Sequence, residues 1–212
     1  MSPRRGIRAM MSRTYLSIER SAALYRRELL PNLDPAAPLP GANTVLPALA
    51  GVPVIHGRDA YSVEYAAHEL PQAVEAETYF DAKKAIFVVG LAPAVFGDLE
   101  LGKSRARFTL AHELGHRVLH TLELMKLSRL PHTEAALLRT RVPVHPNCED
   151  TEWQANAFAA AMLMPVRGLR DLERAIGHLD DRNVAIRFSV SRCAARNRLI
   201  VYRSRKAEFD RL

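Results

Sequence analysis

The sequence predicts an α+β fold, with a mostly helical core in which one long helix packs beside a small, mainly antiparallel sheet. Two apolar segments of helical length, residues 104–121 and 153–164, predict the buried helices of that core. Between residues 52 and 89, shorter apolar segments separated by turn residues predict the strands. With 212 residues, of which 48% are hydrophobic, the chain is long enough to bury this core as one elaborated domain.

The elements before the first long helix follow from local patterns. Residues 1–14 are typical of a disordered basic tail, and residues 15–30 have helical spacing that ends before Pro31. A proline-rich connector then leads to a short helix at residues 44–49. The segments with strand character are residues 52–55, 73–80 and 85–89, the last two joined as a hairpin across residues 81–84.

His112, Glu113 and His116 form a polar motif inside the helix expected at residues 104–121. Residues four apart lie about one turn apart on the same helix face, so both imidazoles can reach one metal ion. Glu113 follows the first histidine directly, and its carboxylate can reach a water molecule on that ion. The alternative is a core helix whose histidines only find hydrogen-bond partners. Because buried charges are costly unless paired or ligated, the pattern favours a zinc site.

A catalytic zinc site needs a third protein ligand, with its fourth position left for water. His120 does not qualify, because it lies eight residues after His112, about 12 Å further along the helix axis. The better candidate is Glu152, at the start of the helix expected at residues 153–164, with Glu149 in reserve. It remains open that Glu152 only complements the dipole of its helix, a role that Glu149 can also fill.

The two motifs together resemble the ImmA/IrrE family of zinc metallopeptidases, of which CapP-like antiphage regulators are a subgroup. The resemblance is carried by Arg107-Phe-Thr-Leu-Ala-His-Glu-Leu-Gly-His116 and by the pattern from Glu152 through Asn156 to Pro165. It implies a zincin-like core and a helix-turn-helix repressor as substrate, whose cleavage switches on stress-response, mobile-element or antiphage genes. The resemblance also implies Zn²⁺ as cofactor, the ligands His112, His116 and Glu152, and the catalytic base Glu113.

With this resemblance the chain divides into a tail at 1–14, a metallopeptidase domain at 15–165 and a basic helical segment at 166–212. The 35 residues between His116 and Glu152 depart from the family pattern and suggest an inserted loop at about 121–150.

The inserted loop contains three further candidate site residues. Cys148 is a candidate inhibitory zinc ligand, because a thiolate in the fourth position would displace the reactive water. The alternative is an ordinary loop cysteine. His145 and His132 are candidate oxyanion stabilisers, and the sequence does not choose between them.

Positive charge is concentrated at the two ends of the chain. Of the formal net charge of +7, residues 1–30 carry +5 and residues 182–212 carry +7, which leaves −5 in between. The C-terminal segment has the pattern of a helix-turn-helix-like unit that presents Arg192, Arg196 and Arg198. These arginines are candidate contacts to nucleic acid, with single-stranded DNA as an activator. The alternatives are solvated arginine-rich ends and a helix pair that only packs on the core.

Composition excludes several classes of protein. The sequence has no apolar segment typical of a signal peptide or a membrane span, and its two cysteines do not make a disulfide framework. We therefore expect a cytoplasmic protein without a membrane partner. The pattern as a whole predicts a zinc-dependent endopeptidase. Two alternatives remain: a DNA-binding regulator with a structural zinc site, and a non-catalytic sensor that binds the repressor without cutting it.

Overall fold

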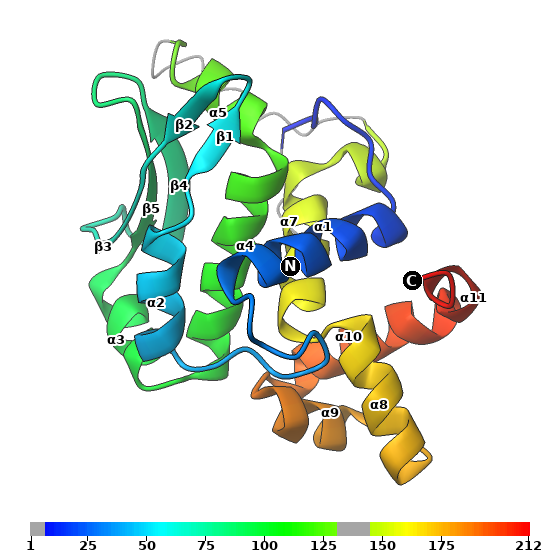
Figure 1. Cartoon of the computed structure of the whole chain (residues 1–212). Coiled ribbons are helices and arrows are strands. Elements are labelled where there is room, and N and C mark those ends of the chain that lie inside the picture. Colours follow the sequence, from blue (N-terminus) through cyan, green and yellow to red (C-terminus); the bar gives the residue numbers. More distant parts are fainter. Residues whose placement is uncertain (1–6, 131–144) are drawn as a thin grey trace.

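Helices α4 (Ser104–Leu119) and α7 (Thr151–Leu163) pack side by side at the centre of the fold, and the sequence predicted both. The computed structural model describes residues 7–130 and 145–212. In Figure 1, α4 lies between the sheet and α7, and α1 (Tyr15–Leu29) packs against α7. Because α7 is apolar on nearly every side, it can be buried on several faces at once, and Phe158 and Met162 are fully buried.

The sheet beside α4 is mixed. Its order is β3 (Val63–Ala67), β5 (Ile86–Leu91) and β4 (Ala76–Asp81), and β5 in the middle is buried along nearly its whole length. The predicted hairpin is confirmed, because β4 and β5 pair antiparallel with Asp81 opposite Ile86. The parallel pairing of β3 with β5 was not predicted. A separate two-stranded hairpin joins β1 (Val54–His56) and β2 (Asp59–Tyr61).

Shorter helices frame the sheet and the ends of α4. Helix α2 (Ala42–Ala50) confirms the short helix predicted after the proline-rich connector, and α3 (Pro93–Glu100) begins with a proline where no backbone donor is needed. Helix α5 (Thr121–Leu127) follows α4 directly, so the segment expected as an inserted loop begins as a helix. A short 3₁₀ helix, η1 (Asn147–Glu149), precedes α7.

Residues 7–13 run along the segment before α7, and the expectation of a disordered tail up to residue 14 is wrong for them. The backbone N–H groups of Ala9 and Arg13 donate to the carbonyls of Glu149 and Cys148, and Met10 donates to the Glu123 carboxylate. These polar groups come from distant parts of the chain, which is why local composition did not reveal the pairing.

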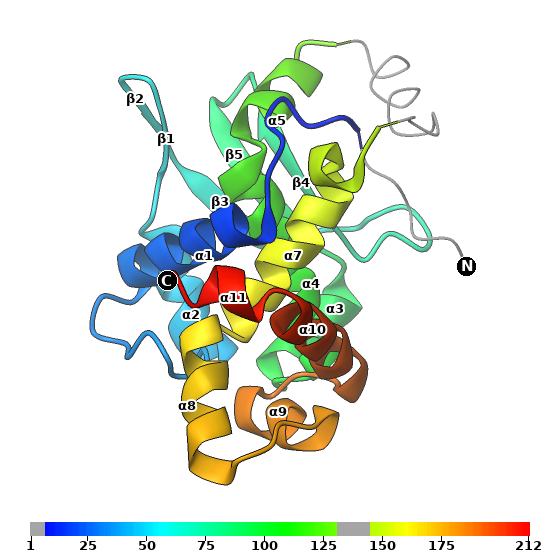
Figure 2. The same cartoon turned by 90° about the vertical axis from the view of Figure 1, so that its right-hand side faces the viewer.

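The C-terminal residues form four helices at the end of the molecule opposite the β1–β2 hairpin (Figures 1 and 2). They are α8 (Val166–Ile176), α9 (Asp181–Phe188), α10 (Arg192–Ser204) and α11 (Lys206–Phe209). A tight turn joins α9 to α10, with Ser189 in the left-handed conformation at φ 54°. The Ser191 hydroxyl caps α10. Within the described part of the chain, no helix is both long enough and apolar enough to span a membrane.

Candidate metal centre

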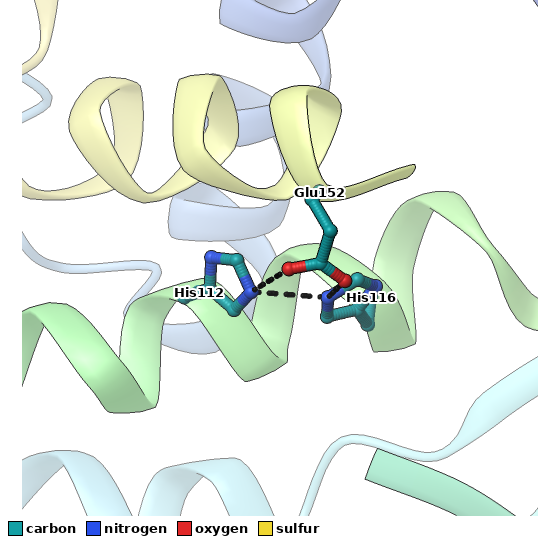
Figure 3. Close-up of side chains that lie close together, drawn as sticks. All are labelled: His112, His116 and Glu152. Atoms are coloured by element: carbon teal, nitrogen blue, oxygen red, sulfur yellow. Dashed lines mark hydrogen bonds and ion pairs between the residues drawn. The ribbon is translucent and has the colours of Figure 1, made fainter. Parts of the chain in front are cut away.

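Three side chains from α4 and α7 point toward one another between the two helices, which lie side by side (Figure 3). The Nε2 atoms of His112 and His116 are 3.1 Å apart, and each lies 3.2 Å from a carboxylate oxygen of Glu152. The two histidines come from successive turns of α4, and Glu152 comes from the first turn of α7. Among residues 7–130 and 145–212, this is the one group of histidine, cysteine or acidic side chains close enough to hold a metal ion together.

The donor set of this centre suits zinc. Ligand atoms at about 2.1 Å from a tetrahedral Zn²⁺ lie about 3.4 Å from one another. The Nε2–Nε2 distance of 3.1 Å and the two Nε2–carboxylate distances of 3.2 Å, one to each oxygen of Glu152, are close to that spacing. The Glu152 side chain is 32% exposed, and those of His112 and His116 are 17% and 14% exposed. The three residues therefore fit a zinc ion that solvent can reach.

The carboxylate and the imidazoles alter one another's protonation. Burial acts to raise the pKa of Glu152, but hydrogen bonds from His112 and His116 outweigh it and hold that pKa well below its ordinary value. Burial acts to lower the pKa of His112, but the hydrogen bond to Glu152 and the charge of Glu113 outweigh it and raise that pKa. Glu152 is therefore held in its ionised form, the form in which it serves as a metal ligand.

Each histidine at the centre has a hydrogen-bond partner at its other ring nitrogen. His112 Nδ1 lies 3.1 Å from Asn156 Oδ1, and His116 Nδ1 lies 3.1 Å from His120 Nδ1. Burial, followed by the proximity of His116, lowers the pKa of His120 to about 3. His120 ends α4 and is not part of the ligand group, as its spacing predicted. The signal for Asn156 was its position on the same helix face as Glu152.

Glu113 lies beside the ligand group and is held by the sheet. Its side chain is buried, and Thr78 Oγ1 on β4 donates a hydrogen bond of 2.7 Å to its Oε2. A buried carboxylate with a fixed donor has a defined orientation. Nothing in the sequence pointed to Thr78, because the contact depends on how β4 packs against α4.

Gly115 sets how closely α4 and α7 approach. A Cβ atom added at Gly115 would lie 2.8 Å from Ala155 Cα and 3.0 Å from the Ala155 carbonyl oxygen. Real Cβ atoms essentially never come as close as 2.8 Å to another atom and rarely come as close as 3.0 Å, and both contacts involve the backbone of α7. The glycine inside the histidine motif thus lets the helix that carries Glu152 approach the helix that carries the histidines.

The remaining acidic and sulfur candidates near α7 have other contacts. Glu149, the reserve ligand, accepts a hydrogen bond of 2.8 Å from Arg8 Nε and lies outside the ligand group. The sulfur of Cys148 is not among the clustered donor atoms either, and the Cys148 carbonyl accepts a hydrogen bond from Gln154 Nε2. The inhibitory role of Cys148 stays a prediction.

The two candidate oxyanion stabilisers have different outcomes. His145 Nε2 lies 3.1 Å from Asp150 Oδ2, and its side chain is nearly fully buried beside the residue that caps α7. This position gives no support to an oxyanion role. His132 lies outside the described residues, so its role stays a prediction.

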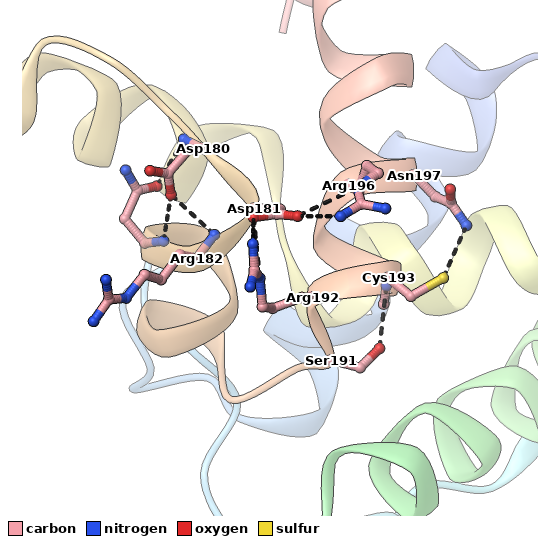
Figure 4. A network of polar contacts seen from close by, with 10 residues as sticks. Asp180, Asp181, Arg182, Ser191, Arg192, Cys193, Arg196 and Asn197 are labelled. Atoms are coloured by element: carbon pink, nitrogen blue, oxygen red, sulfur yellow. Dashed lines mark hydrogen bonds and ion pairs between the residues drawn. The ribbon is translucent and has the colours of Figure 1, made fainter.

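The three C-terminal arginines named from the sequence do not share one environment. Arg192 and Arg196 are exposed and pair with the two carboxylate oxygens of Asp181, at 2.9 and 2.8 Å (Figure 4). Arg198 is only 3% exposed and pairs with Glu19 on α1 at 2.6 Å. The expectation that Arg198 projects from the surface is therefore wrong, because a buried carboxylate from the other end of the chain draws it into the core.

Comparisons with known proteins agree with the motifs. The Peptidase_M78 family, described as the IrrE N-terminal-like domain, matches residues 67–200. No curated protein matches the sequence. A solved structure titled "Mycobacterium tuberculosis transcriptional regulator" aligns with a TM-score of 0.43 and 16% identity. That alignment covers 84% of this chain and 53% of the other, so the chain spans about half of that protein's length. Because the family match extends over more than half of its residues, the chain belongs to the Peptidase_M78 family, the ImmA/IrrE family that its motifs predicted.

Proposed function

We propose that the protein is a zinc-dependent endopeptidase, with His112, His116 and Glu152 as metal ligands and Glu113 as general base. One observation carries the proposal: two imidazoles and a carboxylate converge within 3.2 Å, and a second carboxylate follows the first histidine. Membership of a metallopeptidase family supports the same reading. A structural zinc site would have four protein ligands. Within residues 7–130 and 145–212 the group contains three, which favours catalysis.

The chemistry follows from the two carboxylates. A zinc ion at this site supplies a Lewis acid that polarises a peptide carbonyl and makes water more acidic. Glu113 takes a proton from the attacking water and delivers it to the leaving amine, a role that requires a fixed carboxylate beside the ligands. Thr78 supports this orientation through its hydrogen bond to Glu113 Oε2. Glu152, held ionised by the two histidines, serves the metal rather than the proton transfer.

The proposed substrate is a helix-turn-helix repressor, whose cleavage switches on stress-response, mobile-element or antiphage genes in the cytoplasm. Family membership supports this substrate. Single-stranded DNA is the proposed activator. The exposed side chains of Arg192 and Arg196 support a contact to phosphates.

The test is to incubate the purified protein with the helix-turn-helix repressor encoded nearest to its gene, with and without a zinc chelator. We expect cleavage that the chelator abolishes and that added zinc restores. The Glu113→Gln variant serves as the matched control, because it retains all three proposed ligands.

Two other functions predict different results in that experiment. A DNA-binding regulator with a structural zinc site would neither bind nor cut the repressor. A non-catalytic sensor would form a complex with an intact repressor, and Glu113→Gln would not alter that complex. Either result with zinc-loaded protein, with single-stranded DNA present as the proposed activator, would rule out the endopeptidase.

A further inference from the structure

A hydrogen-bonded chain runs from the candidate ligand His116 into the protein interior. His116 Nδ1 lies 3.1 Å from His120 Nδ1, and His120 Nε2 lies 3.0 Å from Gln154 Oε1. Gln154 Nε2 then donates to two backbone carbonyls, that of Met11 at 2.9 Å and that of Cys148 at 2.7 Å. His120 is 1% exposed and Gln154 is fully buried, so water does not compete for these groups.

The two carbonyls at the end determine the direction of every hydrogen bond in the chain. A carbonyl oxygen only accepts, so the amide nitrogen of Gln154 faces both carbonyls and its oxygen faces His120. His120 Nε2 must therefore carry a proton. In a neutral imidazole the other nitrogen then accepts, so His120 Nδ1 receives the hydrogen bond and His116 Nδ1 donates it. A neutral His116 consequently has its lone pair on Nε2, the atom that faces His112 and Glu152 and that would bind the metal. Without the metal, the same nitrogen can carry a second proton for the Glu152 carboxylate, and Nδ1 stays protonated in either case.

We propose that His120 and Gln154 are positioning residues that hold His116 in the tautomer able to bind the metal through Nε2. The inference rests on the proposed zinc site. It adds that the tautomer of His116 is selected from outside α4, by the backbone carbonyls of Met11 in the N-terminal segment and Cys148 in η1. Partners of this kind typically contribute about 10- to 100-fold to metal affinity. His112 has a simpler arrangement, in which one amide oxygen, that of Asn156, accepts from Nδ1.

The first test needs no variant. Nitrogen-15 NMR of the imidazoles in chelator-treated protein reports which ring nitrogen carries the proton. We expect a proton on Nδ1 of His116, whether or not its Nε2 also carries one, and a proton on Nε2 alone of His120. A proton on Nδ1 of His120, or an Nδ1 of His116 without a proton, would overturn the proposal whether or not the protein is a peptidase.

The second test measures the dissociation constant for zinc by competition with a chromophoric chelator. His120→Leu removes the acceptor for His116 Nδ1 and should weaken zinc binding about 10- to 100-fold. His120→Gln should restore most of the affinity, because its amide can accept from His116 and donate to Gln154. Thr121→Ala is the neighbouring control, since the Thr121 hydroxyl donates only to the Arg117 carbonyl. That variant should bind zinc as the unmodified protein does.

The outcomes separate this inference from the proposed function. If unmodified protein binds zinc and cuts its substrate while His120→Leu binds zinc equally well, the positioning role is wrong and the peptidase stands. If unmodified protein binds no zinc, the proposed site fails. The NMR measurement still decides the direction of the hydrogen bonds from His116 through His120 to Gln154. Should His120→Leu not fold, the zinc affinity of Gln154→Met and the tautomers of the unmodified protein decide whether the positioning role is right.

Discussion

Two carboxylates lie at the same centre, and their surroundings differ. Glu152 is held between two imidazoles, which keep its pKa low and leave it ionised. Glu113 is held by a hydroxyl from the sheet and lies outside the group of donor atoms. Substitution of each residue should therefore affect a different measurable property.

Glu113→Gln should retain zinc and lose activity. The amide keeps the size of the side chain but cannot take a proton from water, so kcat should fall about 100- to 10,000-fold. Metal analysis and peptide hydrolysis measured on the same preparation check this. Glu152→Ala is the contrasting variant, in which zinc content itself should fall. If Glu113→Gln loses its zinc, Glu113 has been given the wrong role.

Gly115→Ala should separate α4 from α7 and weaken the centre between them. The added methyl group meets the backbone of Ala155, which cannot rotate away, so we expect a loss of about 1–3 kcal/mol in the free energy of unfolding. Zinc affinity should fall as well. Gly97→Ala on α3 is the matched control, because a Cβ there meets nothing within 4 Å. Equal stability of the two variants would show that the close approach is unimportant.

At the scale of elements, the sequence predicted the helices and strands whose structure depends mainly on their own residues. Helices α4 and α7 are long and apolar, and the β4–β5 hairpin carries a turn between two apolar segments. The strand β3 escaped prediction, since two of its five residues are alanines with little preference for strands. The pairing of residues 7–13 depends on groups more than a hundred positions away. Local sequence patterns therefore cannot predict these contacts.

Helices α9 and α10 yield a prediction about nucleic acid. Asp181 neutralises part of the charge of Arg192 and Arg196, and these two ion pairs hold down the pKa of its carboxyl group. Asp181→Asn should free both guanidinium groups and tighten binding of single-stranded DNA. Replacing both arginines by alanine should weaken it. Fluorescence anisotropy with a labelled oligonucleotide, measured from about 50 mM salt upward, checks this, because phosphate contacts weaken steeply with salt. No binding at the lowest salt would exclude the contact.

At the scale of the whole molecule, one polar cluster joins the C-terminal helices to α1 and to the end of α7. Arg198 on α10 pairs with Glu19 on α1 and donates to the Met164 carbonyl at the end of α7. Glu19 also accepts from the Val166 N–H. The expected boundary at residue 165 falls inside this cluster. The sequence did not identify Arg198 as the buried arginine, because its partner lies 179 residues away.

Arg198→Met should destabilise the whole fold. It leaves the buried Glu19 carboxylate without its partner, which typically costs about 3–5 kcal/mol. The Arg198→Met, Glu19→Met double variant should recover part of that loss, because no charge then stays buried alone. Urea denaturation of the three proteins measures both changes. If the double variant is no more stable than the single one, the two side chains are not energetically coupled.

The position of Arg198 also determines when, during translation, the polar cluster around Glu19 becomes complete. All three proposed ligands have been synthesised by residue 152, yet the residue that neutralises Glu19 follows 46 positions after that. A ribosome has therefore to add these residues after the last proposed ligand before α1 and the end of α7 acquire their partner from α10. The polar cluster around Glu19 is thus completed later in synthesis than the set of residues that forms the proposed metal site.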